Sequence, residues 1–192
     1  FLIVTPYYNK PTQEGMYRHF SMVAEGVDKP VSLYNVPART GVDLKPETVM
    51  RLSEHGNIAG IKEATGELER VRLLREGCQP DFYLLSGDDG TSCEFILGGG
   101  DGVISVTANV AAAQMRQLCD AARSGDHEGA KAIDSALQDL HRVLFVESNP
   151  IPVKWALEQM GLISEGIRLP LTRLASGYHE AVLSAMARIG IE

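Results

Sequence analysis

The chain has 192 residues, of which 44% are hydrophobic, and its formal net charge is −7 at pH 7. This composition supports a substantial core in one or two domains. The 18 Lys and Arg residues are scattered, so no nucleic-acid partner is expected. No apolar run approaches the roughly 20 residues of a membrane span, so no membrane partner is expected either. The three cysteines and five histidines are dispersed, which predicts reduced thiols in the cytoplasm and no metal site.

Short apolar runs alternate with helical patterns along the first part of the chain. The helical patterns start at Thr12, Pro46, Leu68 and Thr91. Near-continuous apolar runs are typical of parallel strands that are covered on both faces. Strand–helix alternation therefore predicts repeated βα units in one sheet. The predicted strands are Leu2–Tyr8, Val31–Val36, Ile58–Lys62, Phe82–Ser86 and Gly102–Thr107.

Two α/β architectures accommodate five such units. The first is a (β/α)8 TIM barrel, of which five units are about half; because the sequence opens on Phe1 inside an apolar run, we expect the first three units to be absent from this numbering. The second is a complete doubly wound sheet, but no predicted strand is followed by GxGxxG. The glycines at 98–102 follow a helix and precede a strand, which predicts a helix C-cap and turn. The barrel is the favoured fold class.

Only helical patterns follow Thr107. They cover Ala111–Arg123, His127–Phe145, Pro152–Met160 and Leu171–Ile189. The first of these would complete the eighth βα unit. We therefore predict βα units four to eight at 1–125 and a C-terminal helical domain at 126–192.

One lysine lies at the carboxyl end of a predicted strand. Lys62 closes the apolar run of "GIKEATG", and functional groups of βα barrels collect at strand carboxyl ends. Desolvation lowers the pKa of a lysine because the ammonium form loses hydration, and a neutral amine can form a Schiff base with a carbonyl. The alternative is a lysine that pairs with Glu63 or reaches the rim of the barrel. Position alone does not separate these interpretations.

Other polar side chains follow neighbouring strands. Tyr34 ends the preceding strand, where its phenol is either a proton carrier for imine chemistry or a packed strand aromatic. Tyr7 and Tyr8 would point to opposite faces if their strand stays regular. Arg39 follows a proline turn and either binds a carboxylate or holds the loop by an ion pair. Asp88 and Asp89 precede a short helix, where capping is the favoured role.

Six motifs together resemble the dihydrodipicolinate synthase family, which belongs to the pyruvate-dependent class I aldolase group that includes sialic acid lyase. Singly the motifs are moderate signals, but they occur in register over essentially the whole chain. The family's strand order makes the run that starts at Leu2 the fourth strand of the barrel. The motifs are "VTPYYNKP" (4–11), "YNVPARTG" (34–41), "GIKEATG" (60–66), "LLSGDDG" (84–90), "GVISVTAN" (102–109) and "SNPIPVKWAL" (148–157).

The resemblance implies a role for each matching residue. Lys62 would form the Schiff base with pyruvate, and Tyr34 would donate and accept the protons of imine formation. Tyr8 would be a relay tyrosine that inserts into the site of a dimer partner, and its neighbour Tyr7 would lie at this interface and at a possible inhibitor site. Arg39 would receive the carboxylate of aspartate semialdehyde, and sialic acid lyase lacks this arginine. Ile104 would contact pyruvate through its backbone.

The implied activity is a lyase of lysine and diaminopimelate biosynthesis that condenses pyruvate with L-aspartate 4-semialdehyde to 4-hydroxy-tetrahydrodipicolinate. No cofactor beyond the covalent imine on Lys62 is implied, and the implied assembly is a cytoplasmic homotetramer of tight dimers. One alternative is a related Schiff-base aldolase that acts on another aldehyde. Another is a non-catalytic relative, which the presence of Lys62 and Tyr34 disfavours.

Overall fold

The computed structural model describes residues 1–191 and divides them into two compact units, Phe1–Ile104 and Ser105–Glu192. The predicted domain boundary at 125 falls inside the second unit, between helices α6 (Ala112–Arg123) and α7 (His127–Val143), which pack on each other. The domain boundary at 125 therefore stays a prediction. The assignment of α6 to an eighth βα unit stays a prediction.

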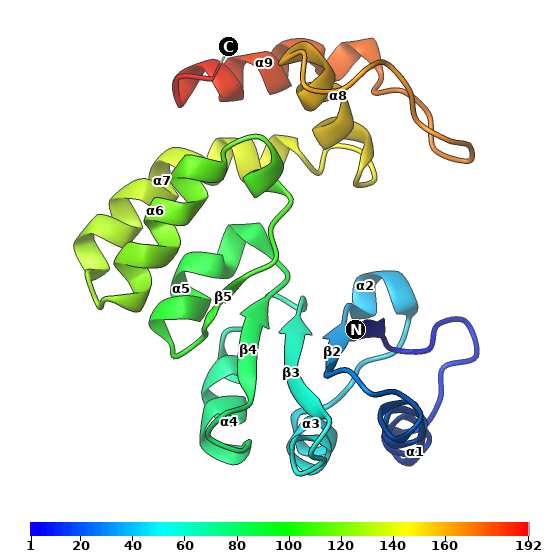
Figure 1. The fold of residues 1–192 in the computed structure, drawn as a ribbon. Helices are drawn as coiled ribbons and strands as arrows, with labels where there is room; N and C mark the ends of the chain where they lie inside the picture. Colours follow the sequence, from blue (N-terminus) through cyan, green and yellow to red (C-terminus); the bar gives the residue numbers. More distant parts are fainter. Residues whose placement is uncertain (192) are drawn as a thin grey trace. The chain divides into compact units, whose positions relative to one another are not determined.

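The first unit is a parallel sheet whose strands follow chain order. β1 (Leu2–Val4), β2 (Val31–Asn35), β3 (Ile58–Glu63), β4 (Tyr83–Ser86) and β5 (Gly102–Val103) lie side by side in the order β1-β2-β3-β4-β5 (Figure 1). Every pairing is parallel. The predicted parallel sheet is confirmed.

Helices connect successive strands of this sheet. They are α1 (Gln13–Glu25), α2 (Pro37–Thr40), α3 (Pro46–Ser53), α4 (Glu69–Gly77) and α5 (Ser92–Leu97), with the 3-10 turn η1 (Asp89–Thr91) before α5. The Thr12 side chain accepts a hydrogen bond from the Gly15 N–H and caps α1, while Pro46 occupies the first turn of α3. These start signals explain why the helices begin where the sequence predicts.

The sheet has one buried face and one half-buried face. Leu33, Ile61 and Leu84 point toward the connecting helices and are fully buried in the core, together with Met16 and Phe20 of α1. The alternate residues of the same strands, among them Ser32, Tyr34 and Lys62, keep intermediate exposure. The half-buried face carries the candidate site.

Two predicted strands are shorter by several residues in the structure. β1 ends at Val4 rather than Tyr8 because Pro6 has no N–H to donate to the ladder, and Tyr8 has a positive φ of 69°. β5 contains only Gly102–Val103, and a 3-10 turn, η2 (Thr107–Asn109), follows. The carboxyl ends of both strands are therefore irregular chain.

The second unit is helical. In it α6 packs on α7, α7 on α9 (His179–Arg188), and α8 (Ile151–Gln159) on α9. The predicted helix Leu171–Ile189 is wrong in its first half: only the 3-10 turn η3 (Ser176–Tyr178) precedes α9. Ser and Gly in this turn are poor helix formers. Among residues 1–191, none of the helices combines the length and apolar character that crossing a bilayer requires.

Candidate active site

Tyr34 and Lys62 are paired neighbours on β2 and β3. The register of the two strands places them directly opposite each other, so both side chains lie on the half-buried face of the sheet. The Lys62 Nζ atom lies 4.4 Å from the centroid of the Tyr34 ring. The structure therefore brings together the amine and the phenol that the sequence predicts to share a site.

A glycine beyond the end of β4 leaves room for the lysine side chain. A Cβ atom on Gly87 would lie 2.8 Å from the Lys62 Cε and 2.6 Å from the Ala64 Cβ. Both distances are shorter than real contacts allow, so position 87 requires glycine if Lys62 is to keep this conformation. The sequence analysis does not identify this role, although the motif "LLSGDDG" contains the residue.

Burial and nearby charges shift the pKa values of both groups. Burial lowers the pKa of the Lys62 ammonium; the charge of Asp89 opposes this shift and the charge of Arg39 adds to it. Burial also raises the pKa of Tyr34, and Arg39 partly offsets that rise. The amine is thus easier to discharge than an exposed lysine, and the phenol keeps its proton at neutral pH.

Arg39 and Asp89 are the two charged side chains that act on Lys62. Arg39 belongs to the short helix α2, directly after β2, and Asp89 is buried in η1, after β4. Asp88 is the residue before η1, but its side chain makes no capping bond there and its Oδ2 accepts a hydrogen bond from Thr91 Oγ1 instead. For Asp88 the predicted capping role is wrong.

The remaining predicted residues lie at the irregular strand ends. Tyr7 and Tyr8 are 68% and 92% exposed in this chain, and the bend at Tyr8 means that regular strand alternation does not govern their directions. Ile104 is 40% exposed, and its N–H donates to the Ser86 carbonyl oxygen at 2.9 Å. The roles of these three residues remain predictions.

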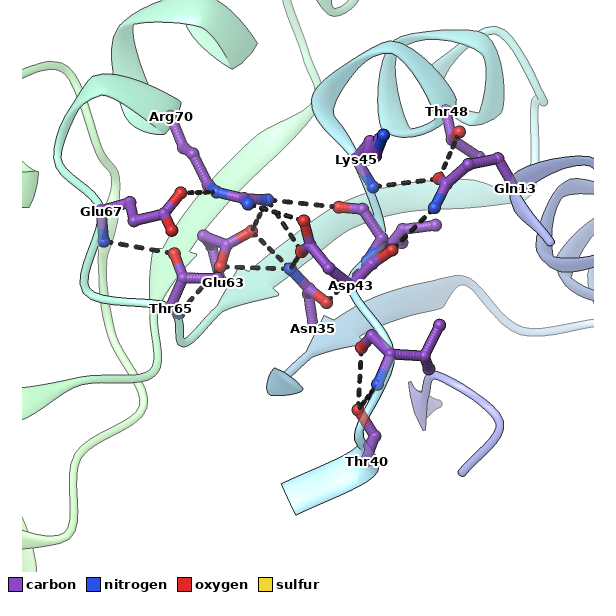
Figure 2. A network of polar contacts seen from close by, with 12 residues as sticks. Gln13, Asn35, Thr40, Asp43, Lys45, Thr48, Glu63, Thr65, Glu67 and Arg70 are labelled. Atoms are coloured by element: carbon purple, nitrogen blue, oxygen red, sulfur yellow. Dashed lines mark hydrogen bonds and ion pairs between the residues drawn. The ribbon is translucent and has the colours of Figure 1, made fainter. Parts of the chain in front are cut away.

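A polar network occupies the opposite face of the same strand ends (Figure 2). Asn35 and Glu63 follow Tyr34 and Lys62 and are paired with each other in register, so both point away from the lysine and are buried. Glu63 accepts hydrogen bonds from the Thr65 N–H and the Asn35 amide. Pairing of Lys62 with Glu63, one of the two alternative interpretations of the lysine, is therefore wrong.

The network could not be identified from composition or motif alone. Its members are separated in sequence, and each taken singly is an ordinary polar residue. The available signal was the alternation of side chains along a strand. If Tyr34 and Lys62 lie on the half-buried face, the residues that follow them, Asn35 and Glu63, must lie on the other face. Burial raises the pKa of the Glu63 carboxyl despite its hydrogen bonds. Within the described residues, no cluster of His, Cys, Asp and Glu side chains is arranged to hold a metal ion.

The parallel βα sheet, with its amine and phenol at adjacent strand ends, defines a protein of the (β/α)8 barrel class, as predicted. The chain belongs to the Dihydrodipicolinate synthetase family, whose family model matches residues 1–189.

Close relatives and solved structures agree with this assignment. The chain is 62% identical over 190 residues to the 4-hydroxy-tetrahydrodipicolinate synthase of Methylococcus capsulatus, covering 99% of this chain and 65% of that relative. It is 58% identical over 190 residues to the synthase of the same name from Cellvibrio japonicus, covering 99% and 66%. The crystal structure of dihydrodipicolinate synthase from Acinetobacter baumannii complexed with pyruvate superimposes with a TM-score of 0.97 at 52% identity, covering all of this chain and 66% of that one. The chain thus spans about two thirds of the length of these proteins.

Proposed function

We propose that this chain carries the Schiff-base site of a lyase that condenses pyruvate with L-aspartate 4-semialdehyde to 4-hydroxy-tetrahydrodipicolinate, in lysine and diaminopimelate biosynthesis. The observation that carries the proposal is the half-buried Lys62 amine, 4.4 Å from the centre of the Tyr34 ring. The names of the relatives, and the pyruvate in the Acinetobacter baumannii structure, support the same activity.

The first step is imine formation at Lys62. The neutral amine attacks the ketone carbon of pyruvate; a C–N bond forms and the carbonyl oxygen takes a proton from the Tyr34 hydroxyl. The attacked nitrogen returns a proton to the Tyr34 phenolate, and Tyr34 passes it to the carbinolamine hydroxyl, which leaves as water and gives a protonated C=N bond. The iminium draws electrons from the methyl carbon, so that loss of a methyl proton to the Tyr34 phenolate gives a nucleophilic enamine and restores the phenol. A lowered pKa of Lys62 favours the first of these events because it increases the neutral fraction of the amine.

The second substrate would meet Arg39. The enamine carbon attacks the aldehyde carbon, and the guanidinium of Arg39 binds the carboxylate of aspartate semialdehyde by paired hydrogen bonds. Ile104 would position pyruvate through its backbone, and Tyr8 would relay protons in the site of a partner subunit. The high exposure of Tyr7 and Tyr8 supports an interface role for both, and Tyr7 would also line a possible inhibitor site.

The proposal includes no cofactor besides the covalent imine. It includes a homotetramer of tight dimers, in which the exposed Tyr7 and Tyr8 would contact a neighbouring subunit. It places the protein in the cytoplasm, in keeping with three cysteines that form no disulfide.

Borohydride trapping tests the proposed function. We expect pyruvate and borohydride to add the mass of a reduced pyruvate adduct to the full-length protein, and peptide mass spectrometry to locate it at Lys62. Lys62→Arg keeps the charge but should abolish the adduct, while Lys29→Arg, at an exposed turn, should leave it unchanged. An unmodified Lys62 in the wild-type protein would contradict the mechanism.

A further inference from the structure

The turn that carries Arg39 is tied to the sheet by polar side chains as well as by Val42 and Leu44, which pack in the core. The turn that follows β2 and the turn that follows β3 border a hollow of about 220 Å³, lined by Pro37, Ala38 and Asp43 on one side and by Ala64, Thr65, Glu67 and Arg70 on the other. The two turns do not fill this space, and polar contacts across it join them.

Asn35 makes the first of these contacts. Its Nδ2 donates to Asp43 Oδ1 at 2.9 Å and to Glu63 Oε2 at 3.1 Å, and its Oδ1 accepts from the Leu44 N–H at 3.0 Å. Asn35 is fully buried and adjoins Tyr34. One amide therefore joins the end of β2, the end of β3 and the segment that returns from α2.

Arg70 of α4 makes the second contact. Its guanidinium binds both carboxylate oxygens of Asp43, at 3.0 and 2.7 Å, and its Nε donates to Glu67 at 2.6 Å (Figure 2). A Glu63 oxygen lies 3.9 Å from the same group. The Arg70 side chain is only 12% exposed, so this ion pair is less screened than those on the surface.

A third contact approaches the same segment from α1. Gln13 Nε2 donates to the Asp43 carbonyl oxygen at 2.8 Å, and Gln13 Oε1 accepts from the Lys45 N–H at 3.1 Å and from Thr48 Oγ1 at 2.7 Å. Asp43 is thus held by its backbone from one side and by its carboxylate from two others. It lies four residues after Arg39, and the intervening Gly41 has a positive φ of 72°.

We propose that Asn35, Asp43, Glu63 and Arg70, here called the strand-end network, are positioning residues that fix Arg39 relative to Lys62 and so govern use of the second substrate. The proposal rests on the proposed function and deepens it. The β2–β3 pairing itself holds Tyr34 beside Lys62, so imine formation does not need the network. The position of α2 depends on it.

The decisive variant is Asp43→Ala in the full-length protein. We expect kcat/KM for aspartate semialdehyde to fall about 10- to 100-fold, the scale for a displaced binding group. Borohydride trapping of pyruvate on Lys62, measured well above the acidic limb of its pH profile, should be unchanged. Asp43→Asn keeps the size and one acceptor oxygen, so it should show a smaller loss of kcat/KM for aspartate semialdehyde, again without loss of trapping. It replaces Asp43→Ala in this test if Asp43→Ala does not fold.

Asp101→Ala is the matched control. Asp101 pairs with Arg75, also on α4, at 2.7 Å and accepts from the Leu84 N–H, but it precedes β5, two strands away from the strand that carries Lys62. Its loss should cost comparable stability, measured as Tm, without selective loss of aldehyde use.

A double-mutant cycle separates positioning from general weakening. If Asp43 acts through Arg39, then Arg39→Ala with Asp43→Ala should be no worse toward the aldehyde than Arg39→Ala alone. Additive losses, equal losses of trapping and aldehyde use, or the same selectivity in Asp101→Ala would each overturn the proposal. A wild-type protein without an adduct on Lys62 would instead contradict the proposed function.

Discussion

Arg39 acts on two groups of the candidate site through its charge alone. Burial is the main reason for the lowered pKa of Lys62 and the raised pKa of Tyr34, and the Arg39 charge lowers both. A positive charge disfavours the ammonium form of Lys62 and favours the phenolate form of Tyr34. Arg39 therefore has an effect on imine formation in addition to its proposed contact with the aldehyde's carboxylate.

Arg39→Ala should separate these two effects. Without the positive charge the pKa of Lys62 rises, so less of the amine is neutral at a given pH and the acidic limb of the pH profile for imine formation moves to higher pH. Well above that limb, trapping should match the wild type. Loss of a charge-assisted bond to the carboxylate should cost about 1.5–3 kcal/mol, roughly 10- to 150-fold in kcat/KM for aspartate semialdehyde.

Arg39→Lys is the control for charge. It should keep the acidic limb where the wild type has it but lose part of the aldehyde use, because an ammonium cannot pair bidentately with a carboxylate. Equal losses for both substrates at high pH would instead show Arg39 to be a residue that only holds its loop.

At this scale the sequence was sufficient to place Lys62, Tyr34 and Arg39 at one edge of the sheet. Lys62 and Tyr34 lie near the carboxyl ends of predicted strands and Arg39 follows one, and parallel strands bring their carboxyl ends to one edge. The outward-facing Asn35 and Glu63 could not be identified in this way, because their partners Asp43 and Arg70 are set by the packing of α4 and by the chain's path after α2.

Two rows of side chains on β2, β3 and β4 build the half-buried face. The register aligns Tyr34, Lys62 and Leu85 in one row, and Ser32, Gly60 and Tyr83 in the next, toward the amino ends of the strands. The Tyr83 ring covers Gly60, and its hydroxyl contacts the Ser32 hydroxyl. The second row therefore packs beside the row that contains Lys62. The Tyr83 ring can take its place in this row only because residue 60 of β3 is a glycine.

Gly60→Ala should destabilise the protein because its Cβ would overlap the Tyr83 ring. Overpacking of this kind costs about 1–3 kcal/mol of the free energy of unfolding, measurable by urea denaturation. Gly56→Ala is the matched control: a Cβ there has nothing within 4 Å and the φ is not positive, so stability should be almost unchanged. If both variants unfold at the same urea concentration, the packing of the Tyr83 ring does not require a glycine at position 60.

Element types and most helix starts were predictable, but the carboxyl ends of β1 and β5 were not. The strands of the sheet were recognisable from apolar runs. The early end of β1 follows instead from Pro6 and from the left-handed backbone of Tyr8, and neither is visible in the number of apolar residues. The register shift at Val31–Ser32 that aligns Ser32 with Gly60 is also a result of packing between strands.

At the scale of the whole chain, the strand edges of the first unit matter most. β1 and β5 are the outer strands of the sheet among the described residues, and each pairs with a strand on one side only. Phe1 and Leu2, on or next to β1, are 61% and 48% exposed. A parallel sheet is normally covered on both faces, and an exposed edge can pair with another chain.

We therefore expect the 192-residue chain, produced by itself, to self-associate and to lack condensation activity. Size-exclusion chromatography with light scattering should show a broad, concentration-dependent mass, whereas a protein of the relatives' full length should give a defined oligomer. Leu2→Lys places a charge on the edge strand and should reduce the association of the short chain, while Leu183→Lys, on the exposed face of α9, should have no such effect. A short chain that is monodisperse and active would show that its strand edges are harmless and that the site needs nothing beyond these residues.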